Sequence, residues 1–80
     1  MMRQILINFI EEELLNNESS VAEDQELLMS GLIDSMGVMR LVAQIENLKQ
    51  IVIPPADVTL ENFSTVNAMA DYVDSRLTAA

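Results

Sequence analysis

The pattern that most constrains this chain is a run of five apolar residues at helical spacing near its middle. They stand at i, i+3, i+4, i+7 and i+10, and they are Val38, Leu41, Val42, Ile45 and Leu48. This spacing puts all five on one face of an α-helix and predicts an amphipathic helix from about Ser35 to Lys49. Asp34 or Ser35 can cap its N-terminus, and Lys49 suits the negative end of the helix dipole. The rest of the chain must supply apolar surface that buries this face.

Two further segments have helical periodicity. The first runs from about Arg3 to Leu15, and its predicted buried residues are Met2, Leu6, Phe9, Ile10 and Leu14. Glutamates crowd its C-terminal part, where the helix dipole disfavours them, so we expect fraying near Asn16 and Asn17. The last helix has Ser64 as its predicted N-cap, and one face carries Val66, Met69, Ala70, Val73 and Leu77.

The connections between these helices differ in character. Residues 16–34 have no sustained period, and we expect four apolar residues to hold the second half of this long loop to the core: Leu27, Leu28, Leu32 and Ile33. Residues 51–55 are extended because each proline disfavours helix in the residue before it. Ala56 to Glu61 can form one short turn, with Pro55 at a first helical position. We therefore predict an all-α bundle of three main helices plus one short helix, in a single domain over residues 1–80.

Composition excludes several classes of function. The net charge is −9 with only four basic residues, so the chain lacks the clustered cations that nucleic-acid binding needs. Histidine and cysteine are both absent, which excludes Ser-His-Asp and Cys-His catalysis and ordinary zinc sites. We therefore expect no enzymatic activity from this chain alone. We see neither a signal peptide nor a membrane span, and we expect a cytoplasmic monomer.

Ser35 lies where the long loop becomes a helix. At a helix N-terminus, unpaired backbone N–H groups and the positive end of the dipole favour a bound or attached phosphate. Asp34 opposes this as a like charge, although it can cap the helix. A simpler interpretation is that Asp34 or Ser35 only caps the helix, and the dipeptide alone does not decide between the two.

The polar face of the same helix is not very polar. Projection at the helical period places Met36, Met39 and Ala43 away from the buried stripe, beside Arg40 and Asn47. Exposed methionine is typical of surfaces that bind several partners, because its side chain is flexible and polarizable. The alternative is that the loop folds over both methionines and makes them core.

Together these residues resemble a known family. Gly31-Leu32-Ile33-Asp34-Ser35-Met36, followed by an amphipathic helix, is similar to the phosphopantetheine attachment motif of acyl and peptidyl carrier proteins. The resemblance extends to the loop at residues 24–34. It also includes Ile53-Pro54-Pro55-Ala56-Asp57-Val58 and Phe63-Ser64-Thr65-Val66, which look like the family's third and fourth helical segments. It therefore covers nearly the whole chain in the right order.

The resemblance implies a four-helix bundle whose Ser35 receives 4′-phosphopantetheine from coenzyme A through a phosphopantetheinyl transferase. The terminal thiol of that arm then holds an acyl or aminoacyl group as a thioester. A loading ligase and a downstream acyltransferase or synthase are the further partners. By the same resemblance, Asp34 flanks the modified serine, and Met36, Met39, Arg40 and Ala43 form the face shown to partner enzymes.

The chain also departs from part of the family. Carriers for fatty-acid synthesis usually have an acidic second helix, whereas Glu46 is the only acid in this one. A specialised pathway is therefore favoured. Residues 31–37 are similar to the same region of D-alanyl carrier proteins, which suggests an aminoacyl cargo, although the Ile53-Pro54-Pro55 segment looks less like that subgroup.

Two other functions stay open. The chain can be an unmodified helical interaction module that keeps a carrier-like fold, in which case Ser35 has no role beyond structure. A small hydrolase that uses Ser35 lacks a general base such as histidine.

Overall fold

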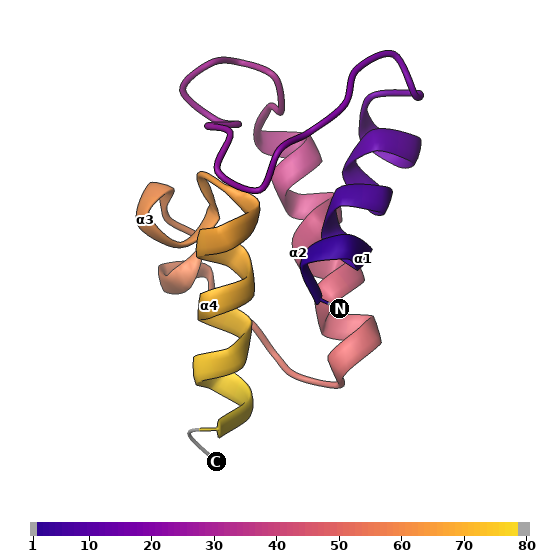
Figure 1. Ribbon diagram of the computed structural model, residues 1–80. Coiled ribbons are helices and arrows are strands. Elements are labelled where there is room, and N and C mark those ends of the chain that lie inside the picture. Colours follow the sequence, from indigo (N-terminus) through magenta and orange to yellow (C-terminus); the bar gives the residue numbers. More distant parts are fainter. Residues whose placement is uncertain (1, 79–80) are drawn as a thin grey trace.

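The computed structural model describes residues 2–78, and their regular structure is helical (Figure 1). The elements are α1 (Met2–Phe9), a π-helical turn η1 (Ile10–Leu14), α2 (Ser35–Lys49), a 3-10 turn η2 (Pro55–Asp57), α3 (Leu60–Phe63) and α4 (Val66–Thr78). Three long helices and one short helix confirm the predicted all-α fold. Residues 51–54 have no regular secondary structure, Pro54 has an extended conformation, and no strand occurs within residues 2–78.

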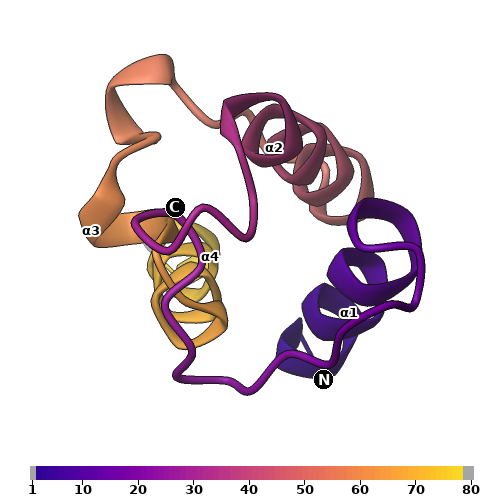
Figure 2. The same ribbon diagram turned by 90° about the horizontal axis from the view of Figure 1, so that it is seen from above.

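The core lies between α1, α2 and α4, which surround it when the molecule is viewed from above (Figure 2). α1 and α3 both pack against α4. The core residues with the largest fully buried side chains are Phe63, Leu6, Ile10, Leu27, Leu41, Ile45, Met69, Val66 and Val73. Most of them come from the predicted apolar stripes, so the helical periodicity correctly identified the core.

The long loop is held to the bundle by both packing and backbone hydrogen bonds. Leu27 and Ile33 are buried, and Leu28 and Leu32 pack against the core, as predicted. The Leu27 N–H donates to the Ser64 carbonyl (2.8 Å), and the Ile33 N–H donates to the Leu27 carbonyl (3.0 Å). The loop that leads into α2 therefore has a defined path.

Glu26 organises the turn between these anchors. Its carboxylate accepts the backbone N–H groups of Leu28, Met29 and Ser30 at 3.0, 2.8 and 2.7 Å. The hydrogen bond from the Met29 N–H is the largest cause that lowers the pKa of Glu26 below its usual value. Sequence reasoning missed this residue, because its role depends on the local path of the loop.

The N-terminal helix differs from the prediction of one regular helix to Leu15. It widens to π geometry, and its end is defined by hydrogen bonds from the Leu15 N–H to the Ile10 carbonyl (2.9 Å) and from the Asn17 N–H to the Glu11 carbonyl (2.7 Å). In place of the expected fraying, Asn16 and Asn17 adopt left-handed conformations with φ of 54° and 61°. Asparagine tolerates this region better than most residues, so the pair turns the chain away from the helix.

Two apolar residues predicted to be buried are exposed. Leu48 is 43% exposed and Leu77 is 42% exposed. Both lie in the last turn of their helices, α2 and α4, and α4 projects beyond the packed part of the bundle (Figure 1). Periodicity identifies the face of a helix but does not show how far along the helix a neighbour covers it.

The predicted cap and turn after α2 also need correction. Ser64 ends α3, and the Thr65 hydroxyl caps α4 by accepting the Ala68 N–H (3.0 Å). The single turn expected over Ala56–Glu61 is two pieces, η2 and α3, which are separated by Val58 and Thr59. Pro55 does occupy the first position of η2, as predicted.

A polar cluster ties η2 to α4. The Tyr72 hydroxyl donates to the Asp57 carboxylate (2.6 Å), and Arg76 approaches both the Tyr72 oxygen (3.1 Å) and Asp57 (3.4 Å). Burial and the hydrogen bond to Asp57 raise the pKa of Tyr72 above its usual value. The Tyr72 ring also lies 5.8 Å from that of Phe63, centroid to centroid.

We predict that Tyr72→Phe lowers the free energy of unfolding by about 1 kcal/mol, because the ring remains while Asp57 loses a donor. Tyr72→Leu should cost more, since it also removes the ring contact. Urea denaturation of the two variants measures both effects. Equal stability of Tyr72→Phe and the parent would show that the hydroxyl contributes nothing.

Candidate functional site

The N-terminus of α2 is capped by Asp34. One oxygen of its carboxylate accepts the Gly37 N–H at 2.8 Å, and its backbone carbonyl accepts the Val38 N–H at 3.0 Å. Of the two predicted caps, Asp34 is therefore the one used. Ser35 is the first residue of the helix, and it is exposed. Its hydroxyl makes no hydrogen bond within the described part of the chain, so it is free for another role.

Two donors remain open at this helix end. The backbone N–H groups of Ser35 and Met36 belong to the first turn, and neither has an acceptor among residues 2–78. They add to the positive end of the α2 dipole, which favours a phosphate there. The Asp34 carboxylate opposes a phosphate, although its bond to Gly37 directs one oxygen toward the helix.

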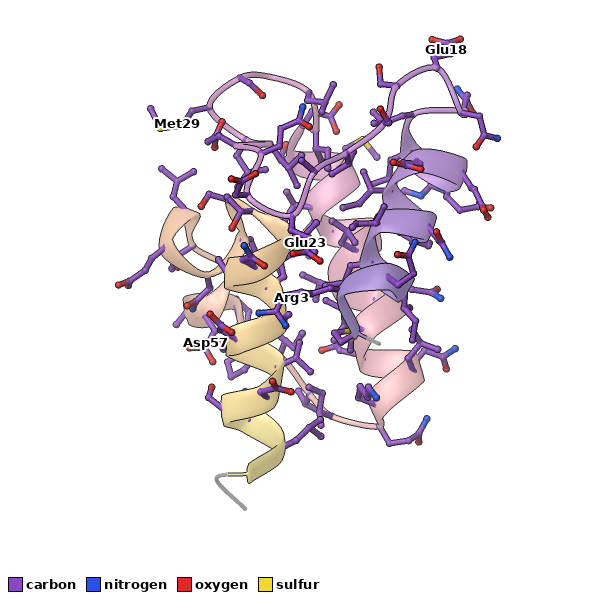
Figure 3. All side chains as sticks on the ribbon, in the orientation of Figure 1. Arg3, Glu18, Glu23, Met29 and Asp57 are labelled. Carbon is purple, nitrogen blue, oxygen red and sulfur yellow. The ribbon has the colours of Figure 1, made fainter. Side chains whose placement is uncertain are left out.

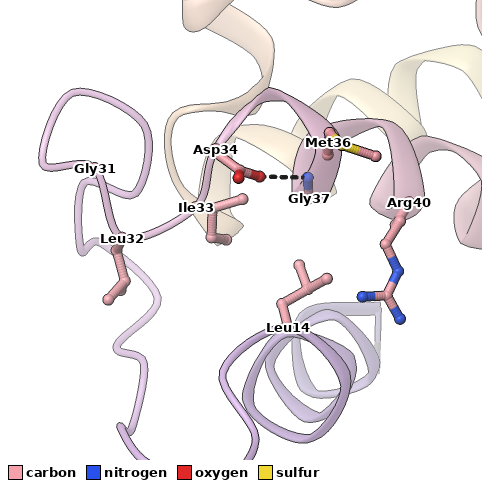
Figure 4. Close-up of a pocket in the computed structure, with 8 residues that line it drawn as sticks. All are labelled: Leu14, Gly31, Leu32, Ile33, Asp34, Met36, Gly37 and Arg40. Atoms are coloured by element: carbon pink, nitrogen blue, oxygen red, sulfur yellow. Dashed lines mark hydrogen bonds between the residues drawn. The ribbon is translucent and has the colours of Figure 1, made fainter.

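Gly37 allows the loop to approach the helix closely (Figure 4). A Cβ atom built at this position would lie 2.7 Å from the Cγ2 methyl of Ile33 and 3.7 Å from a Leu14 methyl. No real side chain tolerates the shorter distance. The missing side chain therefore makes room for the buried Ile33, which stands directly before Asp34 and Ser35.

A hollow lies on each side of this helix end. The first, of about 360 Å³, is bounded by Leu14 of η1, by loop residues 31–34 and by Met36, Gly37 and Arg40 of α2 (Figure 4). The second, of about 380 Å³, contains Ser35 in its lining, and its apolar walls come from Leu28, Ile33, Val38, Met39, Val58, Leu60 and Phe63. Ser35 thus stands at the edge of an apolar hollow between α2 and α3.

The methionines beside Ser35 are exposed, which agrees with the interpretation that they lie on the surface and not in the core. Met36 is 74% exposed and Met39 is 57% exposed, so the loop does not cover them. They share a shallow surface with Ser35, Arg40 and Ala43, and we call these five residues the α2 patch. Its role in partner binding stays a prediction.

Arg40 closes one side of the α2 patch. Its guanidinium donates to the Glu13 carbonyl (3.3 Å) and lies 3.8 Å from the Glu13 carboxylate. A cation near the carbonyl end of η1 is electrostatically favourable. Arg40 therefore connects the patch to the end of the first helix.

The described residues contain no group of three or more acidic, histidine or cysteine side chains that could hold a metal ion. None of the helices over residues 2–78 is long and apolar enough to cross a membrane.

Comparison with known proteins identifies the family of this chain. The family model "Phosphopantetheine attachment site" matches residues 4–73. The chain belongs to this family. A D-alanyl carrier protein of Streptococcus suis is 29% identical over 72 residues, which cover 90% of each chain. That of Streptococcus uberis is 31% identical over 62 residues (78% of each), and that of Lactococcus lactis is 27% identical over 75 residues (94% of this chain, 95% of the relative).

The protein is therefore a phosphopantetheine carrier protein, and 4′-phosphopantetheine is its covalent cofactor. Carriers of this kind hold a group as a thioester and pass it between enzymes, and they are generally not catalysts themselves. The α2 N-terminus fits such a group on two counts: an exposed hydroxyl, and two backbone N–H groups that have no acceptor among the described residues. When bound, the arm supplies the thiol that this cysteine-free chain lacks.

We predict that Gly37→Ala destabilises the protein, although alanine alone favours an exposed helix by about 1 kcal/mol over glycine. The new methyl must displace Ile33, and overpacking of this kind costs about 1–3 kcal/mol. Urea denaturation gives the net change in the free energy of unfolding.

Ile33→Leu provides the matched background, because leucine has no Cγ2 methyl branch at that position. In this background Gly37→Ala should be neutral or stabilising. If Gly37→Ala destabilises the Ile33→Leu background as much as it destabilises the parent, the contact between Ile33 and Gly37 does not cause the loss.

Proposed function

We propose that Ser35 is the residue that carries the phosphopantetheine arm and that the cargo is a small aminoacyl group, with D-alanine as the first candidate. The observation that carries the proposal is the free, exposed Ser35 hydroxyl at the N-terminus of a helix that Asp34 already caps. Because the cap is a separate residue, modification of Ser35 leaves the start of the helix intact.

The cargo is inferred from the relatives and from the surface of α2. The relatives compared above are D-alanyl carrier proteins, and their similarity extends along most of the chain. The only acid of α2 is Glu46, and its carboxylate accepts the Ile53 N–H at 2.7 Å. α2 therefore offers partners an apolar patch with Arg40 in place of a row of free acids, which supports a specialised carrier.

In this function the chain positions and presents the cargo, and we propose that it catalyses no step itself. Asp34 and Gly37 hold the serine at the helix end, and the α2 patch provides the contact surface for enzymes. A phosphopantetheinyl transferase modifies Ser35, a ligase loads the arm, and an acceptor enzyme removes the cargo. A single carrier domain over residues 1–80 and a cytoplasmic location both stay predictions.

The intact mass of the protein measures directly whether the phosphopantetheine arm has been attached. We expect the full chain, incubated with coenzyme A and a broad-specificity phosphopantetheinyl transferase, to gain one phosphopantetheine unit. Ser35→Ala should gain none and should keep the stability of the parent, because Ser35 is exposed and does not cap α2.

Ser19→Ala is the matched control, since Ser19 is also exposed and lies in the long loop. It should be modified like the parent. If the parent chain stays unmodified, or if Ser35→Ala is still modified, Ser35 is not the attachment residue. The first of these results would favour the unmodified interaction module.

The proposed role of the α2 patch in partner binding leads to a separate prediction. Met39→Glu should lower kcat/KM for loading of the arm by a D-alanine-activating ligase about tenfold, because a charge replaces a desolvated contact. The free energy of unfolding should change by less than about 0.5 kcal/mol, since Met39 is exposed.

Val52→Glu controls for the loss of an exposed apolar residue elsewhere, because Val52 is 73% exposed in the extended connection after α2. Its loading should match that of the parent. If Met39→Glu loses stability in parallel with loading, Met39 is part of the core and not of a contact surface.

A further inference from the structure

A second surface feature lies on the far side of Arg40 from Ser35. A groove of about 440 Å³ runs between α1 and α2, and it is lined by Ile5, Asn8, Phe9, Glu12, Glu13 and Gln44. Four of these residues stand at i, i+3, i+4 and i+7 along the first helix, so they share one face beside the buried stripe. Ile5 is 38% exposed although it is apolar. Ile5 and Phe9 therefore give the groove an apolar strip among polar and acidic side chains.

The wall of this groove is negatively charged and incompletely neutralised. Glu13 faces Arg40, whereas the exposed Glu12 has no hydrogen-bond or ion-pair partner among the described residues. Three of the four cations of the chain are used in ion pairs. The loop after η1 adds Glu18, which is exposed and has no side-chain partner among the described residues. Figure 3 shows Glu18 at the tip of this loop, pointing away from the helices.

We propose that this α1–α2 groove docks a cationic amphipathic helix of a partner enzyme. An apolar side chain of that helix would contact Ile5 and Phe9, and its lysine or arginine residues would face Glu12 and Glu13. A groove between two helices suits an amphipathic helix, and opposite charge at its rim selects a basic one. The proposal rests on the carrier function, because a carrier must be recognised by several enzymes.

Charge disfavours the other occupants of an apolar groove. A second copy of this chain would bring another net charge of −9, and an anionic membrane surface would also be repelled. An acidic or neutral helix would leave Glu12 unpaired at the edge of the contact. The groove is therefore matched to a basic partner surface.

The position of the groove also relates it to Ser35. Gln44 in its wall follows Ala43 of the α2 patch, and Arg40 lies between Glu13 and the patch. One partner can therefore contact both surfaces along α2. The charged groove would orient the enzyme, and the apolar patch would bring its active site to the serine.

The direct test uses the unmodified full chain and two synthetic helical peptides, one of leucine and lysine and one of leucine and glutamate. In NMR titrations, the basic peptide should shift the amide signals of Ile5–Glu13 and Gln44, and the acidic peptide should not. Glu12→Lys should weaken binding of the basic peptide about fivefold at low salt. Glu61→Lys makes the same change in charge on α3, and it should weaken binding less than twofold.

Three results would overturn the proposal: shifts confined to the α2 patch, equal binding of both peptides, or equal loss in Glu12→Lys and Glu61→Lys. The last would indicate a response to net charge alone. Because the peptides need neither Ser35 nor the arm, failure here is separate from failure of phosphopantetheine attachment.

Discussion

The position of Ser35 depends on the contact between the Ile33 side chain and the backbone at Gly37. Ile33 is buried, and its N–H is bonded to the Leu27 carbonyl, so the end of the loop is fixed to the core. The absence of a Cβ atom at Gly37 lets this side chain seat against α2. Asp34, held between the two, then reaches the Gly37 N–H. Ser35 consequently begins the helix with its hydroxyl free, which is the property that an attachment residue needs.

Much of this arrangement could be predicted because it follows from periodicity and capping. The bounds of α2 agree with the apolar stripe and the Asp34 cap, and the exposure of Met36 and Met39 follows from the same projection. The resemblance to carrier proteins covered Gly31 to Met36 together with the loop before it and the later helical segments, and the family match over residues 4–73 confirms it. Local patterns were sufficient here because a helix fixes the relative directions of its own side chains.

The features that sequence reasoning missed depend on contacts between distant residues. Leu48 and Leu77 lie on the predicted faces, but they stay 43% and 42% exposed because neighbouring segments cover the last turns of α2 and α4 only in part. No pattern in the sequence distinguishes Glu26 from the other acids, whereas the path of the loop places three backbone N–H groups around it. Both outcomes depend on where other segments end, and a one-dimensional pattern does not contain that information.

The acids of this chain divide into two groups with different physical roles. Near Ser35, the carboxylates of Asp34 and Glu26 accept backbone N–H groups. Glu46, the one acid of α2, does the same near the other end of the helix, so α2 has no free acid of its own. Along the first helix and the following loop, Glu11 accepts the Val21 N–H and Glu13 is paired with Arg40. Glu12 and Glu18 are exposed and have no side-chain partner among the described residues. Apolar contact acts only at short range, whereas the field of unpaired charge extends over about 8–10 Å at physiological salt. This separation lets the field of the unpaired acids orient a partner before it touches the helix that begins at Ser35.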